Sequence, residues 1–301
     1  MRRGGKGATR GAGVKKIPWG MMVLTFLLAL VYEALHLTPL KHLARRLFVK
    51  VEGRRATVAG LPLVEYRKDD GKRKRLVIAQ HGYGARKEGM RDFAVRLAAA
   101  GYFVVTPDAV GHGERDEPGG RGIPEIVERT VAEYDALIEA YRGRPEVDAE
   151  NFSIVGRSMG GSIAYRYALR GRYKPRAIAP TITSPDFRDL VDYQLGLSRY
   201  EGHRIVHLED SREIEERNRL LEETNHFEEL VALEDVAVLA QNMRFDFLVR
   251  PDGSERLVRA RAARKAGIDA RAFEFRCLFA FFHYSPDRAQ KNIIAFLKAQ
   301  G

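Results

Sequence analysis

The sequence predicts an α/β fold, with a mostly parallel β-sheet that helices cover on both faces. Three observations support this prediction: strand and helix patterns alternate along the chain, several strands are continuous apolar runs, and glycine loops follow some of them. The 301 residues, 45% of them hydrophobic, are enough for one large domain with an ample core. We expect residues 47–301 to form this domain.

The individual elements follow from composition and spacing. Residues 48–68 contain short β-branched runs with Gly and Pro between them, which favours antiparallel strands. Further strands are expected within residues 75–84, 102–115, 151–158, 176–183, 245–250 and 270–282. Helices are expected where apolar residues recur at helical spacing, at residues 90–101, 123–142, 159–171, 254–267 and 285–301.

The positive charge is concentrated at the N-terminus. The chain carries a formal net charge of +11, but residues 1–55 hold 12 Lys and Arg against two acidic residues. The remaining 246 residues hold 39 basic and 38 acidic side chains, so the domain is nearly neutral. This distribution argues against a nucleic-acid-binding domain, and we expect no nucleic-acid partner.

The chain contains a single cysteine, Cys277, within the apolar run FEFRCLFAFF. One cysteine excludes a disulfide within the chain and any zinc site that needs two or more cysteines. No metal-binding pattern with acidic residues is formed by His36, His42, His203, His207 and His226. We therefore expect neither a metal nor a cofactor. A buried structural thiol is the simplest interpretation of Cys277.

The N-terminus predicts a membrane anchor. Residues 1–16 form a basic, Gly-rich tail that we expect to be disordered, and residues 17–37 form an apolar segment with Trp19 and Tyr32 near its ends. About 20 helical residues span the hydrocarbon layer of a bilayer. Two alternatives remain: a signal peptide, although no A-x-A cleavage pattern follows, and a soluble helix.

The charges that flank this segment give a weak orientation signal. Six basic residues precede it and six follow it closely. Because the leading block contains no acidic residue, we expect the N-terminus inside the cell and the domain on the extracytoplasmic side of the membrane.

A serine lies between two glycines where a predicted strand meets a predicted helix. The stretch GRSMGG, residues 156–161, contains Ser158 with Gly156 and Gly160 on either side. A sharp strand-to-helix turn would hold Ser158 in strained φ and ψ, and side chains at the glycines would collide with the neighbouring strand and helix. The positive end of the following helix favours negative charge near the serine. This context predicts a nucleophile.

Four pieces of sequence in the same order carry a family resemblance. These are HGYG (81–84), PDAVGHGER (107–115), GRSMGG (156–161) and FHYSPDRAQKNIIAFL (282–297). Over roughly residues 55–300 the chain resembles the α/β-hydrolase fold, in particular small serine esterases and the related prolyl-oligopeptidase-like hydrolases. In that family His81 and His112 would be structural.

The resemblance implies roles for four residues. Ser158 would be the nucleophile, and His283 would be the general base that takes its proton. The backbone N–H groups of Met159 and Tyr83 would form the oxyanion hole. No metal is needed for this chemistry.

The family's catalytic triad is completed by an acid that orients the histidine, and two residues of this chain could supply it. The family places it after the seventh strand, usually in a loop of the form G-x-x-D-x-x-V. With the strand at residues 245–250, the loop is RPDGSERLV, residues 250–258. Glu255 then fits the D-x-x-V register, whereas Asp252 is the aspartate of the loop, so both stay open as the orienting acid. The chain departs from the family in having Phe282 before His283, where a glycine is usual.

A segment of about 60 residues separates two of the predicted strands. Residues 184–243 are acidic, and their apolar residues recur at helical spacing. In this family such an insertion forms a cap over the serine and lines the substrate pocket, and we expect the same here. The alternative is a solvated helical face without a role in substrate binding.

Together these features predict a serine hydrolase, of the carboxylesterase type, that cleaves acyl esters through an acyl-enzyme. The apolar anchor suits a lipid-like ester. A peptidase or an acyltransferase uses the same fold and triad, and a non-catalytic binding protein on this fold is the alternative of another class.

Overall fold

The computed structural model describes residues 51–115, 122–186, 225–244, 246, 249, 251–264, 271–275 and 287–301. These residues belong to the second of the two units into which the chain divides, Ala44–Gly301. The predicted tail and anchor (1–16 and 17–37), His283 and Cys277 lie outside the described residues, so the predictions for them stay predictions. Among the residues that are described, no helix is long and apolar enough to span a bilayer.

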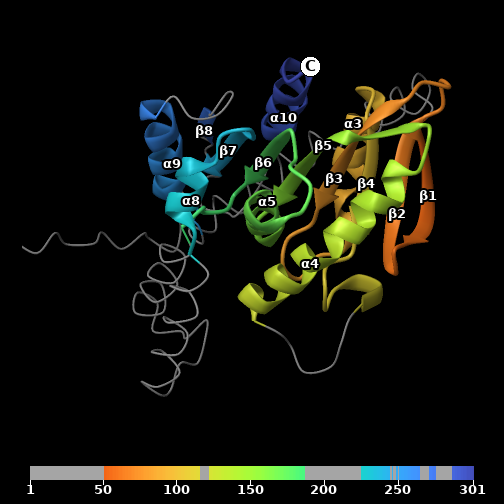
Figure 1. Ribbon diagram of the computed structural model, residues 1–301, viewed down its shortest axis with the longest axis horizontal. Coiled ribbons are helices and arrows are strands. Elements are labelled where there is room, and N and C mark those ends of the chain that lie inside the picture. Colours follow the sequence, from red (N-terminus) through yellow and green to blue (C-terminus); the bar gives the residue numbers. More distant parts are fainter. Residues whose placement is uncertain are drawn as a thin grey trace, which may run out of the picture. The chain divides into compact units, whose positions relative to one another are not determined.

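Eight strands form one sheet in the order β1-β2-β4-β3-β5-β6-β7-β8 (Figure 1). The first two pairings, β1 with β2 and β2 with β4, are antiparallel, and all the others are parallel. The strands are β1 (Val51–Val58), β2 (Leu61–Lys68), β3 (Lys74–Gln80), β4 (Phe103–Pro107), β5 (Val147–Arg157), β6 (Ala177–Thr181), β7 (Ala237–Met243) and β8 (Arg271–Phe275). The predicted mostly parallel sheet, with antiparallel strands at its start, is confirmed.

Helices cover both faces of the sheet, as the sequence predicts (Figure 1). The described helices are α3 (Arg91–Ala99), α4 (Ile123–Arg142), α5 (Met159–Arg170), α8 (Phe227–Ala232), α9 (Asp252–Ala263) and α10 (Asp287–Ala299), with short 3-10 turns η1 (Lys87–Met90) and η2 (Gly113–Arg115). Side chains of α4, α5, α8 and α9 share one apolar cluster. Side chains of α3 and α10 belong to a second cluster.

Of the strand predicted at residues 245–250, the structure describes only Asp246 and Val249, and neither lies in a strand. The strand that pairs with β6 and β8 is β7, Ala237–Met243. All seven of its residues are buried, because helices cover both faces of the sheet at this position, so its sequence shows no alternation of apolar and polar residues. In the sequence, the Ala, Val and Leu residues of β7 continue the spacing of the helical segment before them, so they resemble a helix. The aromatic run FDFLVR has the higher strand propensity, and the strand was therefore predicted there.

The position of β7 also changes the end of the predicted cap and the place of the predicted acid loop. The predicted cap, residues 184–243, ends too late, because β7 is part of the sheet and α8 contributes Leu230 and Val231 to the apolar core. Residues 187–224 lie outside the described residues, so a cap in that segment stays a prediction. The predicted acid loop, residues 250–258, is also wrong, because α9 begins at Asp252.

Candidate active site

Ser158 occupies the turn between β5 and α5. Its φ of 53° and ψ of −122° are unusual for a residue with a side chain, and such strain costs about 1–3 kcal/mol. Its N–H donates to the carbonyl of Thr181 at 2.9 Å, and its carbonyl accepts the N–H of Gly161 at 2.7 Å. These bonds hold the serine at the apex of the turn, and the predicted strained geometry is confirmed.

The glycines on either side of the serine are required by close backbone contacts. A Cβ on Gly156 would collide with the carbonyl of Gly160 in the first turn of α5. A Cβ on Gly160 would collide in turn with the carbonyls of Gln80 and His81 at the end of β3. Helix α5 therefore approaches both strands more closely than side chains permit, as the sequence predicts.

The loop after β3 lies directly against the serine. An ideal Cβ built on Gly82 would lie 3.2 Å from the Cβ of Ser158 and 3.1 Å from the carbonyl oxygen of Arg157. Tyr83 follows Gly82, and its side chain is 56% exposed. Met159, the other predicted oxyanion donor, is the first residue of α5, where a helix has no internal partner for its N–H. The structure thus brings Ser158 together with both predicted donor residues.

The carboxyl ends of β5, β6 and β7 meet beside the serine. While Ser158 donates to Thr181 at the end of β6, the N–H of Ile182 donates to the carbonyl of Gln241 in β7 at 2.7 Å. Ile182 itself has a φ of 50°, which is rare for a β-branched residue. Backbone strain therefore occurs at two neighbouring positions on this edge of the sheet.

The two predicted acids lie in the first turn of α9. Asp252 is exposed, and Glu255 forms an ion pair with Arg259 at 2.8 Å on the same helix. Neither follows a strand directly, because β7 ends at Met243.

The sequence analysis missed a third acid, Asp246, three residues after β7. It is 4% exposed, its carboxylate accepts the N–H of Val249 at 2.9 Å, and its own N–H donates to the carbonyl of Met243. Asp246 and Val249 also fit the D-x-x-V register, once the strand before them is placed at Ala237–Met243. The signal was present in MRFDFLV, but the incorrect strand assignment placed the aspartate inside the strand.

Known proteins show the same architecture. A profile of the family described as Serine aminopeptidase, S33, matches residues 71–201. Over 157 residues the chain is 29% identical to "Putative esterase YitV" of Bacillus subtilis (strain 168), and the match covers 50% of this chain and 61% of that relative. TT1662 from Thermus thermophilus superposes with a TM-score of 0.59 at 19% identity, over 83% of this chain and 98% of the other. The Pyrococcus furiosus esterase Pf2001 gives 0.58 at 14% identity, over 85% and 94%.

The chain has the α/β-hydrolase fold. The order of its strands, the turn at Ser158 and these similarities agree with the resemblance found in the sequence. The proteins to which it is similar include esterases, and the matching family profile is described as a serine aminopeptidase.

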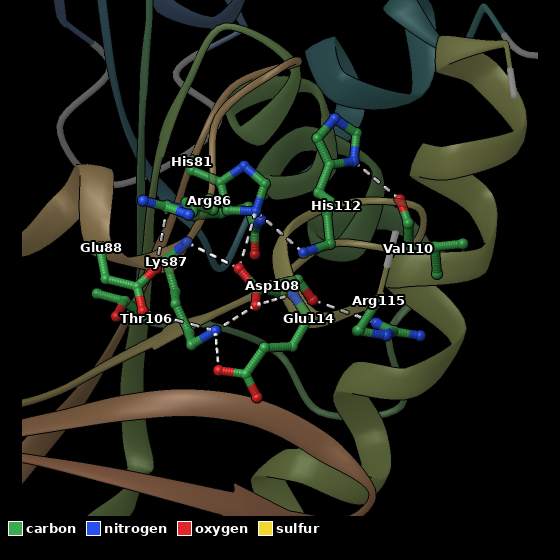
Figure 2. Close-up of polar contacts among 12 residues, drawn as sticks. His81, Arg86, Lys87, Glu88, Thr106, Asp108, Val110, His112, Glu114 and Arg115 are labelled. Carbon is green, nitrogen blue, oxygen red and sulfur yellow. Dashed lines mark hydrogen bonds and ion pairs between the residues drawn. The ribbon is translucent and has the colours of Figure 1, made fainter. Parts of the chain in front are cut away.

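A buried polar cluster supports the loop after β3 (Figure 2). Lys87 is 2% exposed, and its Nζ donates to Asp108 at 2.5 Å and lies 2.8 Å from Glu114. Asp108, just after β4, is fully buried. Burial acts to raise the pKa of Asp108, but the hydrogen bonds from Lys87 outweigh burial, and the pKa of this carboxyl is lowered. The cluster therefore keeps a charged pair inside the protein.

His81 belongs to the same cluster and is neutral. Burial lowers the pKa of its ring. Its Nδ1 lies 2.8 Å from the carbonyl of Gly82, and its Nε2 lies 3.0 Å from the N–H of Ala109. A neutral ring that donates from Nδ1 and accepts at Nε2 satisfies both contacts. This fits the structural role that the family resemblance implies for His81.

No group of three or more His, Cys, Asp or Glu side chains could hold a metal within the described part of the chain. The expectation that the chemistry needs no metal stays a prediction.

We predict that Gly160→Ala lowers the free energy of unfolding by about 1–3 kcal/mol, because the added methyl group collides with the carbonyls at the end of β3. Gly143→Ala is the matched control: Gly143 has a φ of −74°, and no atom lies within 4 Å of its ideal Cβ. The control should change stability by no more than about 1 kcal/mol. Denaturant unfolding of both variants measures the difference, and equal stabilities would contradict the steric argument.

Proposed function

We propose that this chain is a serine hydrolase that cleaves carboxylic esters through an acyl-enzyme. The observation that carries the proposal is the strained backbone of Ser158, at a turn closed by backbone contacts on both sides. A protein that did not need this serine at the apex would gain stability by relaxing it. Two amide donors, those of Met159 and Tyr83, border the same residue.

We infer the reaction from these positions and from the role that the family resemblance implies for His283. The Oγ of Ser158 attacks the ester carbonyl carbon, and His283 takes the Ser158 proton as the bond forms. The N–H groups of Met159 and Tyr83 stabilise the negative charge on the carbonyl oxygen. The intermediate then expels the alcohol, which receives the proton from His283. Water attacks the acyl-enzyme in the same way, releases the carboxylic acid and restores Ser158.

Asp246 is the acid that we propose as the partner of His283. It follows the strand after which the family carries this acid, it is buried, and its carboxylate accepts a backbone N–H. An orienting acid must keep its position while the imidazole becomes charged, and a carboxylate fixed by the backbone meets this requirement. Asp252 and Glu255 remain the alternatives from the sequence.

The similarities favour an ester over a peptide substrate. The curated relative and one of the similar solved structures are named esterases. The family profile, in contrast, is described as a serine aminopeptidase, which makes a peptidase the second candidate. Esters have a better leaving group, so both enzyme types would cleave an activated ester, whereas only a peptidase would cleave an aminoacyl arylamide at a comparable rate.

We also propose that residues 17–37 anchor the domain in a membrane, with the domain on the extracytoplasmic side. The apolar segment is long enough to span a bilayer as a helix. The full chain should sediment with membranes and require detergent for release, and a chain without residues 1–37 should not. A mature protein that begins just after residue 37 would show a signal peptide instead.

We predict that a fluorophosphonate probe labels the wild-type chain, and that Ser158→Ala and His283→Ala abolish the labelling. The probe reacts only with an activated serine, and both residues are needed for activation. Ser162→Ala is the matched control, because Ser162 is a buried serine one turn further along α5, bonded to Thr183, and this variant should still be labelled. A well-folded wild type without labelling would favour the non-catalytic binding protein.

We predict that Asp246→Asn lowers kcat for a p-nitrophenyl ester by about 100-fold or more, since an amide cannot stabilise the charged imidazole. Asp252→Asn and Glu255→Gln should leave kcat within about threefold of the wild type. Asp186→Asn controls for the loss of a buried acid, because Asp186 follows β6 and pairs with Arg256. Loss of activity in an α9 variant, with an active Asp246→Asn, would assign the acid to α9.

A further inference from the structure

The turn that follows β3, residues 82–85, has two central amides, those of Tyr83 and Gly84, which differ in their hydrogen bonding. The N–H of Ala85 donates to the carbonyl of Gly82 and closes the turn, and Gly84 has a φ of +70°. The N–H of Gly84 donates to Nε2 of His112 at 3.0 Å. The N–H of Tyr83 has no hydrogen-bond partner among the described residues. One central amide of the turn is thus bound by His112, and the other is left for a ligand.

His112 is held in the orientation that this bond needs. Its Nδ1 lies 2.9 Å from the carbonyl of Val110 (Figure 2). The residue is 7% exposed. Because a carbonyl can only accept, Nδ1 carries the proton and Nε2 is an acceptor, which suits the N–H of Gly84. The edge of the Tyr83 ring also packs on His112, with ring centroids 5.3 Å apart. His112 therefore contacts both central residues of the turn.

The same segment is attached to the loop after β4 at both of its ends. Before the turn, Nε2 of His81 accepts the N–H of Ala109. After the turn, the N–H of Lys87 donates to Oδ1 of Asp108 at 2.8 Å, and its ammonium group binds the other oxygen of the same carboxylate. With both ends fixed in this way, the bond from the N–H of Gly84 to His112 attaches the central part of the turn to the same loop.

We propose that His112 is a positioning residue for the oxyanion hole: by binding the N–H of Gly84, it holds the turn so that the N–H of Tyr83 stays available beside Ser158. This inference rests on the proposed serine hydrolase mechanism. It assigns His112 a role in the rate of the chemical step rather than in substrate binding. The bond matters most in the transition state, where the oxyanion is fully charged.

Two substitutions separate this role from general support of the fold. In His112→Gln, the side-chain amide places an acceptor oxygen where Nε2 lies, so the bond from Gly84 can form. In His112→Asn, the shorter amide can replace Nδ1 and donate to Val110, but no atom reaches Gly84. Both variants remove the imidazole ring, and only the second also removes the bond to the turn.

The test measures ester hydrolysis with p-nitrophenyl acetate and, independently, amide hydrogen exchange over residues 81–87 in the full-length chain. We expect His112→Asn to lower kcat by about 10- to 100-fold with KM changed less than about threefold, while His112→Gln recovers most of kcat. We also expect faster exchange over residues 81–87 in His112→Asn than in His112→Gln. Exchange does not depend on activity, so it decides the role of His112 in the turn even if the wild-type chain hydrolyses no ester.

Two results would overturn the inference. Equal losses of kcat and equal exchange rates in the two variants would show that His112 supports the fold only through its ring. Unchanged kcat and unchanged exchange in His112→Asn would show that the turn keeps its position without this bond. A wild type without labelling by the fluorophosphonate probe would instead refute the serine hydrolase mechanism, and that result is independent of the exchange measurement.

Discussion

Close contact between the backbones of β3, β5 and α5 determines where Ser158 lies. Gly156 and Gly160 allow the helix to start against both strands, and Gly82 lets the next loop touch the serine Cβ. Side chains at Gly156 and Gly160 would collide with backbone atoms, so α5 could not start as close to the two strands. The strain at Ser158 is the result of this packing, because a turn so short cannot connect the strand to the helix with relaxed dihedrals.

The loops on this edge of the sheet depend on a second constraint, which is electrostatic. A buried lysine or carboxylate alone would be strongly unfavourable, and breaking such a pair typically costs about 3–5 kcal/mol. Lys87 and Asp108 avoid this penalty because the carboxylate also accepts backbone N–H groups from Lys87 and Glu114. The first bond joins the loop after β3 to the Asp108 side chain, and the second joins the loop after β4 to it. The pair therefore fixes the geometry of two loops at once, whatever its net contribution to stability.

Most of the fold follows from local sequence, and the error in it has a physical cause. Amphipathic helices such as α4 and α10 show their period because one face is exposed to water, and their predicted positions match the structure closely. Strand β7 shows no period, because it is buried on both faces in the middle of the sheet. Its identity comes from its pairing with β6 and β8, which are distant in sequence. Local propensity therefore favoured the aromatic run that follows it.

The residues of the candidate site also differ in whether the sequence could predict them. Ser158 and its flanking glycines were predictable, because a short motif between a strand and a helix determines their geometry locally. Asp246 was not, because its position is defined only relative to the end of β7. The bonds that His112 and Asp108 accept from the loop after β3 could not be predicted from the sequence either. They join two glycine loops that are separated along the chain and meet only when β3 and β4 pair.

The environment of each acid favours the proposed position after β7 over the two positions in α9. A carboxylate stabilises an imidazolium more strongly where water is excluded, because the effective dielectric constant is lower there. Asp246 is buried and oriented by the N–H of Val249. Asp252 is exposed to solvent, which screens its charge, and the charge of Glu255 is already balanced by Arg259.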